Sequence, residues 1–391
     1  MLTNSNYFTN HSLLRKHIIL EMKKIFLPFL CLTVLFTNAQ SPRLIIGTYD
    51  SPTTEGIYVY SFNQADGSAK ELSHVKTSNP SFMAVSPNKK YVYAVNENAD
   101  KNGRGGGVSS FAFDKKTGTL SFLNQQSSEG NHPCYITADN TGKWIIAGNY
   151  SSGNFAILPV NDNGLLGKAT QVIQHKGSGP DTARQKSAHV HTTVLSKDNK
   201  NLYVTDLGTD KIMRYDFNEK TGRVNPSLQK FIAVGAGSGP RHIDISKKGK
   251  YIYLLQELTG TLSVFSKIKN EFKIVQTVST LPGLYTGAAG SADIHITPDG
   301  KFLYASNRGL SNSIAIFSIC KSNGELKLIT HQSTLGLNPR NFNLDPSGKF
   351  LLVGNQNSDE VVIFKRDIYT GLLTDTGNRI NIGKPVCIKW L

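Results

Sequence analysis

The chain has 391 residues, 39% of them hydrophobic and 18% charged, a composition typical of a globular protein with enough length for a full core. Its 43 Lys and Arg against 28 Asp and Glu give a formal charge of +15, which favours anions as partners. Nucleic acid is not expected as a partner, because the lysines are scattered through turns and neither a basic helix nor an aromatic RNA-binding signature occurs.

Residues 1–40 are expected to precede the folded domain. Met22 is a natural start, and the segment MKKIFLPFLCLTVLFTNAQ (22–40) has two lysines, a short apolar run and a cleavage site ending at Ala39. This order is typical of a secretory signal peptide, and the apolar run is too short for a transmembrane helix. The sequence therefore predicts an exported protein, periplasmic or secreted, with no membrane attachment after cleavage. The mature domain, 41–391, would keep a charge of +12.

Three cysteines remain after residue 40, namely Cys134, Cys320 and Cys387. An odd number without close spacing argues against a disulfide framework and against a zinc site. We expect all three to be small buried side chains.

A repeat organises the rest of the chain. Its first six copies are NPSFMAVSPNKKYVYAVNE (79–97), HPCYITADNTGKWIIAGNY (132–150), HVHTTVLSKDNKNLYVTDL (189–207), GPRHIDISKKGKYIYLLQE (239–257), GSADIHITPDGKFLYASNR (290–308) and NPRNFNLDPSGKFLLVGNQ (338–356). Each has an alternating strand, a turn and an apolar strand, and two further strands follow. The copies recur every 46–57 residues, a spacing that fits blades of four antiparallel strands.

The two ends of the chain complete the count. KPVCIKWL (384–391) is a lone first strand, and residues 43–75 supply three strands without a first one. Joined, they make one further blade, which brings the total to seven. The sequence therefore predicts an all-β protein, a seven-bladed β-propeller of four-stranded antiparallel blades, closed by N- and C-terminal strands that share one blade.

One hairpin of the repeat carries unusual charges. Arg241 and His242 begin a first strand, and Glu257 follows the second strand that pairs with it. The start of the first strand and the end of the second lie at the same face of an up-and-down blade. The hairpin therefore brings the three side chains together beside the central channel.

The other blades place further polar groups at the same face. The second strands end on Thr48-Tyr49, Asn96-Glu97, Asn149-Tyr150, Asp206-Leu207, Gln256-Glu257, Asn307-Arg308 and Asn355-Gln356. The first strands contribute His189, His191, Asp293, Arg340 and Asn341. Such a ring suits a small anion, because Arg forks bind carboxylate or phosphate and Glu or His can move protons.

Repeats also produce polar columns for structural reasons, and we favour that role for the amides Asn96, Asn149, Asn307 and Asn355. By contrast, Arg241, Glu257, Arg308 and the His189/His191 pair put charge into only a few blades, as an asymmetric site would. His74, His132 and His175 are interpreted as ordinary turn or surface residues.

At these residues the chain resembles the seven-bladed propeller lactonase family, which includes bacterial 6-phosphogluconolactonases and fungal carboxymuconate-cyclising enzymes. The stretches that carry the resemblance are AHVHTTVLSKDNKNLYVTDLGTDKIMRYDF, GSGPRHIDISKKGKYIYLLQEL, SADIHITPDGKFLYASNRG and NPRNFNLDPSGKFLLVGNQ, within residues 43–391. The resemblance implies a metal-independent site without a cofactor, built from a His, a Glu and two Arg. In this sequence they fall on His191 (or His189), Glu257, Arg241 and Arg308.

The expected activity is hydrolysis of a small anionic lactone by a monomer. Arg241 and Arg308 would hold the substrate anion or the developing oxyanion, and Glu257 or His191 would act as general base. The residues expected to bind substrate are His189, His242, Asp206, Asn307 and Arg340. Export would separate the protein from cytosolic 6-phosphogluconolactone, so the sequence does not determine which lactone is the substrate.

Three alternatives remain at this point. The propeller could bind a protein or glycan without catalysis, or run the reaction toward lactone formation. It could also be a calcium-dependent lactonase using Asp206, Glu257 and Asp293, although such sites need a cage richer in carboxylates.

Overall fold

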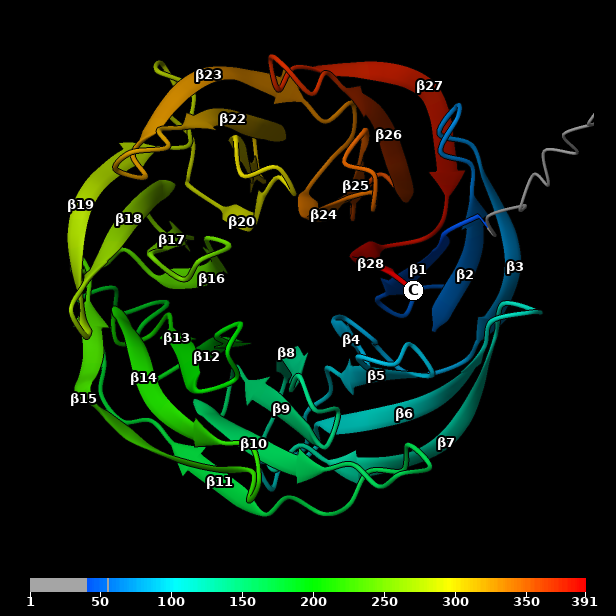
Figure 1. Ribbon diagram of the computed structural model, residues 1–391, viewed down its shortest axis with the longest axis vertical. Helices are drawn as coiled ribbons and strands as arrows, with labels where there is room; N and C mark the ends of the chain where they lie inside the picture. The colour runs from blue at the N-terminus through cyan, green and yellow to red at the C-terminus, as the bar shows by residue number, and fades with distance from the viewer. Residues whose placement is uncertain (1–40, 55) are drawn as a thin grey trace, which may run out of the picture. The chain divides into compact units, whose positions relative to one another are not determined.

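Seven four-stranded sheets are arranged around a common axis in the computed structural model, which describes residues 41–54 and 56–391 (Figure 1). The predicted signal peptide and cleavage site lie outside the described residues. Neighbouring strands within each sheet run antiparallel, and every regular element of the described residues is a β-strand, as predicted. Among the described residues, no helix has the length and apolar character needed to cross a membrane.

The closing blade joins the two ends of the chain. Its order is β28 (Pro385–Trp390), β1 (Arg43–Thr48), β2 (Ile57–Phe62) and β3 (Ala69–Val75). Figure 1 shows red β28 beside blue β1. The ladder pairs Leu44 with Trp390 and Ile46 with Ile388. This confirms the closure predicted from the lone first strand.

The other six blades follow in chain order, each with its first strand innermost. The second blade has β4 (Met83–Val85), β5 (Tyr91–Asn96), β6 (Gly107–Asp114) and β7 (Thr119–Ser127), and the third has β8 (Pro133–Ala138), β9 (Trp144–Asn149), β10 (Asn154–Pro159) and β11 (Gln171–Gln174). The fourth has β12 (Val190–Leu195), β13 (Asn201–Asp206), β14 (Lys211–Asn218) and β15 (Arg223–Ala233), and the fifth has β16 (Pro240–Ile245), β17 (Tyr251–Gln256), β18 (Thr261–Ile268) and β19 (Glu271–Ser279). The sixth has β20 (Ser291–Ile296), β21 (Phe302–Asn307), β22 (Ser313–Ile319) and β23 (Leu326–Ser333), and the seventh has β24 (Pro339–Leu344), β25 (Phe350–Asn355), β26 (Glu360–Arg366) and β27 (Leu373–Asn381).

The core lies between neighbouring sheets. Second strands such as β21 and β25 are buried on both faces, which explains their continuous apolar runs. The outermost strands are mostly exposed or half-buried. Between the sixth and seventh blades, for example, Phe302 and Ile316 share a cluster with Phe342 and Phe364.

A bulge recurs at the start of the first strands. The ladder shifts register between Pro240 and His242, and equivalent shifts occur in β8, β12, β20 and β24. Two residues then oppose one on the partner strand, so the usual alternation of side chains is interrupted. Two successive residues of a first strand, such as Arg241 and His242, can therefore both face the central channel.

Two sequence predictions about burial are corrected by the structure. Cys134 and Cys387 are buried as expected, but Cys320 is exposed, because it lies in the turn after β22. His175 is buried, not at the surface, because the segment after β11 packs its ring against Asp206 and Tyr215, at 2.9 and 3.0 Å. His74 is exposed and His132 half-buried.

Candidate active site

Glu257 is the centre of the charged cluster at the funnel face, the face where second strands end. Its Oε2 accepts a hydrogen bond from Arg241 Nε at 2.8 Å and lies 3.2 Å from Arg308 Nη2. Its Oε1 accepts from Arg184 Nη2 at 2.7 Å. One nearly buried carboxylate therefore holds three guanidinium groups from three different parts of the chain.

The arginines are themselves anchored by the backbone. Arg241 is buried and donates through Nη1 to the carbonyl of Ala292, and Arg308 Nε donates to the carbonyl of Gly290 at 2.8 Å. Both carbonyls lie at the start of the first strand of the sixth blade, so the two guanidinium groups are held in place by its backbone. Arg184 differs, because its side chain is 43% exposed at the rim.

Electrostatics keep this glutamate ionised. Burial opposes ionisation, but Arg308, Arg241 and Arg184 outweigh it and lower the pKa of Glu257 to about 2. Burial lowers the pKa of Arg308 to about 10, with Glu257 opposing and Arg241 adding to the shift. A carboxylate with such a low pKa is a weak base, so its position favours holding the arginines over abstracting a proton.

His191 is the histidine with a free nitrogen beside this cluster. The residue is buried, and its Nδ1 has no hydrogen-bond partner among the described residues. Burial lowers the pKa of His191 well below its ordinary value, and the positive charge of Arg241 adds to the shift. The ring is therefore neutral near pH 7, as a base must be.

His189 is less buried than His191. Its ring stacks on Tyr150 with centroids 4.6 Å apart, and its Nδ1 is 3.0 Å from the Tyr150 carbonyl. Tyr150 also meets the ring of His191 edge-on at 5.7 Å, and its hydroxyl accepts from Arg184 at 3.3 Å. The aromatic ring thus links both histidines to the arginine cluster.

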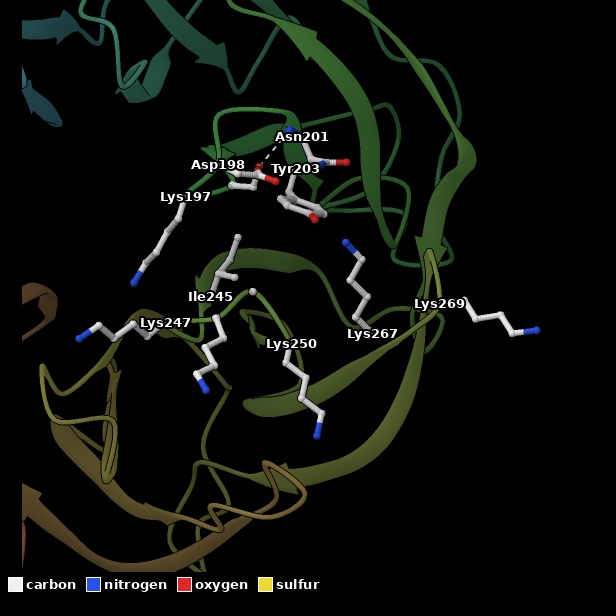
Figure 2. Close-up of a pocket in the computed structure, with 12 residues that line it drawn as sticks. Lys197, Asp198, Asn201, Tyr203, Ile245, Lys247, Lys250, Lys267 and Lys269 are labelled. Atoms are coloured by element: carbon white, nitrogen blue, oxygen red, sulfur yellow. Dashed lines mark hydrogen bonds between the residues drawn. The ribbon is translucent and has the colours of Figure 1, made fainter.

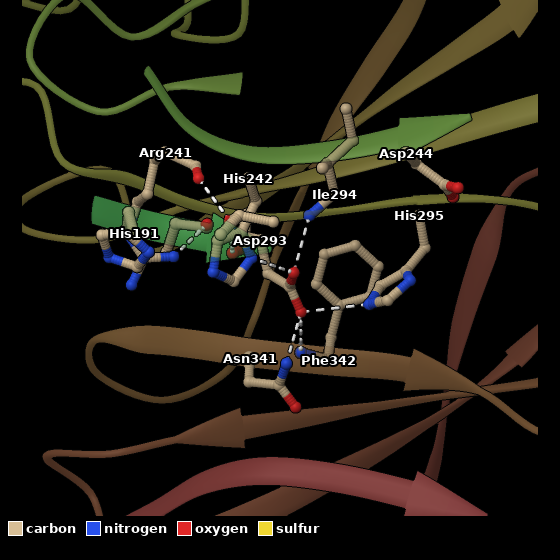
Figure 3. A network of polar contacts seen from close by, with 12 residues as sticks. His191, Arg241, His242, Asp244, Asp293, Ile294, His295, Asn341 and Phe342 are labelled. Carbon is tan, nitrogen blue, oxygen red and sulfur yellow. Dashed lines mark hydrogen bonds and ion pairs between the residues drawn. The ribbon is translucent and has the colours of Figure 1, made fainter. Parts of the chain in front are cut away.

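His242 is oriented by a buried carboxylate (Figure 3). Its Nδ1 lies 2.7 Å from Asp293 Oδ1, and Asp293 Oδ2 accepts from His295 and Asn341. Burial opposes ionisation of Asp293, but His295 and His242 outweigh it and hold its pKa well below the ordinary value. Burial and Arg241 lower the pKa of His242 to about 4, with Asp293 opposing.

The tautomer of His242 follows from this contact. A neutral imidazole facing a carboxylate must carry its proton on the facing nitrogen, here Nδ1. Nε2 then keeps its lone pair. The ring of His242 lies 5.1 Å from that of His191, so a second neutral nitrogen base stands beside the first.

A second charged cluster lies at the same face. Tyr49 donates to Glu97 Oε2 at 2.8 Å, Arg340 Nη2 is 4.0 Å from the same oxygen, and the Arg340 guanidinium lies over the Tyr49 ring at 5.3 Å. Burial opposes protonation of Arg340, but Tyr49 and Glu97 outweigh it and raise its pKa. Arg340 stays positively charged.

The structure brings most of the expected residues together, but two of them are engaged elsewhere. Asp206 accepts from His175, from the backbone of His189 at 2.8 Å and from the backbone of Gly208. The amide of Asn307 bonds Ser291 at the start of the sixth blade and Thr280, which directly follows the last strand of the fifth blade. Both side chains are buried and tie loops to strand ends.

Sequence reasoning missed Arg184 as a member of the cluster, and it placed Tyr150 at this face without giving it a role. Arg184 lies in the irregular segment between β11 and β12, where Asp181 accepts from two nearby backbone N–H groups and Gln185 is buried. The Asp-Thr-Ala-Arg-Gln stretch signals such a turn, but no periodicity shows where the turn sits. In residues 41–54 and 56–391, no group of three or more His, Cys, Asp or Glu is placed to hold a metal ion.

Comparison with known proteins identifies the family of the chain. Residues 43–390 match the family described as lactonase, 7-bladed β-propeller. The chain is 41% identical over 335 residues to 6-phosphogluconolactonase of Formosa agariphila, covering 84% of this chain and 94% of that protein. It is 35% identical to 6-phosphogluconolactonase of Bacillus subtilis, covering 88% and 97%.

A solved structure gives the same picture. The periplasmic gluconolactonase of Pseudomonas aeruginosa superimposes with a TM-score of 0.85 at 34% identity, covering 90% of this chain and 99% of that one. The family match covers residues 43–390, nearly all of the residues that the structure describes. The chain belongs to the seven-bladed β-propeller lactonase family.

Proposed function

We propose that this protein hydrolyses a small lactone that carries an anionic group, of the 6-phosphogluconolactone type. The observation that carries the proposal is the cluster around Glu257, where three arginines stand beside two neutral histidines. With Arg340 and Glu97 included, the two clusters contain four guanidinium groups and two carboxylates. Within these two clusters guanidinium groups outnumber carboxylates, which favours a substrate that carries an anionic group such as a carboxylate or phosphate.

In the proposed mechanism, His191 is the general base. Its free ring nitrogen takes a proton from water, and the resulting hydroxide attacks the lactone carbonyl. Arg241 and Arg308 stabilise the oxyanion of the tetrahedral intermediate. On collapse, the ring C–O bond breaks and the leaving alkoxide takes a proton from the imidazolium, which gives the open hydroxy acid and restores neutral His191.

Glu257 has a holding role in this proposal. It sets the three arginines in place, and its low pKa means that it stays charged through the cycle. When the substrate anion arrives, it shares the guanidinium groups that Glu257 holds in the free enzyme. Both catalysis and binding therefore depend on this carboxylate.

The remaining residues contribute to binding and support. Arg340 and His189 contact the substrate from the rim, and His242 offers its Nε2 as acceptor for a substrate hydroxyl or the attacking water. Asp206 and Asn307 support the strand ends, because neighbouring groups already engage their polar atoms. No metal or cofactor is assigned a role.

We propose export for this protein, to the periplasm or beyond. The support is the leader-like sequence 22–39 and the similarity to a gluconolactonase whose name places it in the periplasm. An unphosphorylated aldonolactone then becomes a second candidate of the same substrate class.

The test is acid release by the purified protein with 6-phosphogluconolactone, gluconolactone and a muconolactone side by side. We expect turnover of one sugar lactone, insensitive to chelator, and its loss in Arg241→Ala. Turnover that chelator abolishes would contradict the metal-independent mechanism. Absence of turnover on all three lactones, with the folded state verified by circular dichroism, would contradict the proposed function.

A further inference from the structure

A lysine-rich groove lies on the face opposite the funnel. It forms between the fourth and fifth blades, has a volume of about 380 Å³, and is lined by the turns after β12, β16 and β18 (Figure 2). First strands begin at the funnel face and end at the other, so these turns are far from the active site along each strand. Six lysines line the groove: Lys197, Lys247, Lys248, Lys250, Lys267 and Lys269.

Their charges are only partly compensated within the groove, because one carboxylate lies among six lysines. None of the six ammonium groups forms an ion pair with a carboxylate of residues 41–54 or 56–391. The acidic residue in the lining is Asp198, whose Oδ1 accepts from Ser196 Oγ at 2.5 Å and from the backbone of Lys200. Like charges that line one groove repel one another, and an anion bound among them would lower that repulsion.

The turn at the centre of the groove departs from the repeat. In five blades the third turn residue accepts a hydrogen bond from the backbone N–H two residues later. These residues are Asn88, Thr141, Asp198, Asp299 and Ser347, bonding Lys90, Lys143, Lys200, Lys301 and Lys349.

In the β16–β17 turn this position is Lys248, whose ammonium group cannot accept a hydrogen bond. The residue before it is Lys247, where three other blades have Pro87, Pro298 and Pro346. The turn thus forgoes two local stabilising features and carries two additional cations in their place. Solubility alone does not require lysine at these two turn positions, because lysines at exposed strand positions would have the same effect.

We propose that this groove binds a compact ligand with several phosphate groups. Lysine ammonium groups act as point charges suited to phosphate oxygens from many directions. The recess favours a small phosphate-dense molecule over a flat surface. The site is independent of the lactone chemistry at the opposite face.

Tripolyphosphate is the probe, and binding to the full protein is measured by calorimetry at low and physiological salt. Wild-type protein should bind with an affinity that falls as salt rises. Lys248→Asp reverses one charge and restores the turn acceptor, so affinity should fall about tenfold or more while Tm does not fall. Lys250→Gln removes one charge and should weaken binding about fivefold.

Lys349→Gln is the matched control, because Lys349 occupies the position of Lys250 in the seventh blade. It should leave tripolyphosphate binding unchanged, and all three variants should keep wild-type lactone turnover. Equal losses in Lys349→Gln and Lys250→Gln would overturn the site in favour of general charge attraction. No binding of tripolyphosphate, or binding only to phosphatidylglycerol vesicles, would also overturn it.

Discussion

Glu97 and Glu257 occupy the same position of the repeat yet have different surroundings. Each directly follows a second strand, β5 or β17, and each lies mostly buried at the funnel face. Glu257 meets three guanidinium groups within 3.2 Å, whereas Glu97 accepts from the Tyr49 hydroxyl and has one arginine at 4.0 Å. The repeat therefore fixes where a carboxylate stands, and side chains from neighbouring blades decide what it does.

The comparison predicts that Glu257→Gln causes the largest loss. Glutamine keeps an acceptor but loses the charge that orients three arginines, so kcat/KM should fall at least about 10³-fold. Steady-state lactone hydrolysis measures this, with circular dichroism and Tm as the check on folding. Near-wild-type turnover would remove Glu257 from the mechanism.

His191→Gln should lower kcat about 10²–10³-fold, because a general base is lost. In the wild type, the pKa of His191 lies below its ordinary value, and the neutral form is the active one. Activity should therefore persist as the pH falls below 6.5 and decline only at lower pH. A pH–rate profile whose acid limb has its midpoint above 6.5 would contradict this assignment.

Asp293→Asn tests how His242 is held. Losing the orienting carboxylate should lower kcat/KM about tenfold to a hundredfold, as for carboxylates that orient metal-bound histidines. Nitrogen NMR of the His242 ring should show that the Nδ1-protonated tautomer is no longer dominant. The control is Asp244→Asn, because Asp244 lies on β16 with His242 but makes no hydrogen bond to its ring. Equal effects of both changes would indicate a merely structural role.

Arg184→Gln should act mainly on binding. The side chain is at the rim and shares Glu257 with two better-buried arginines, so KM for an anionic lactone should rise about tenfold with a smaller change in kcat. An uncharged lactone provides the comparison and should show little change. A larger effect on kcat than on KM would place Arg184 in the chemical step.

Glu97→Gln should have the smallest effect, less than about threefold in kcat/KM. Its Tyr49 contact survives with an amide acceptor, and its arginine lies at the outer edge of ion-pair distance. Measured beside Glu257→Gln, this variant shows whether the loss of activity depends on the position of the carboxylate in the repeat or on its contacts with arginines. Equal losses in the two variants would erase the distinction between the clusters.

The propeller itself could be predicted because its signals are local. Alternation within strands, turn residues such as those after β20 and β24, and the lone strand at 385–390 all follow from short stretches of sequence. Arg241 and Glu257 could be joined for the same reason, since one hairpin connects them. The bulge that turns both Arg241 and His242 to the channel was not predicted, as nothing in the hairpin's alternation marks it.

Contacts between blades could not be predicted in this way. Arg184 reaches Glu257 from an irregular segment 73 residues away, and the burial of His175 depends on Asp206 and Tyr215 in the next blade. The lysines of the groove appeared scattered along the chain because three separate turns supply them. Each case needs the angle between sheets, which no repeat period contains.

The shared closing blade has a consequence for how the molecule is made. β1 has no inner partner until β28, about 340 residues later, has been synthesised. Until then its backbone groups form an open edge, and the ring is held only by contacts between consecutive sheets. Closing such a long loop is a slow, late event. The last strand therefore closes the ring. In a chain truncated before Pro385, the free edge of β1 would be accessible to chaperones and proteases.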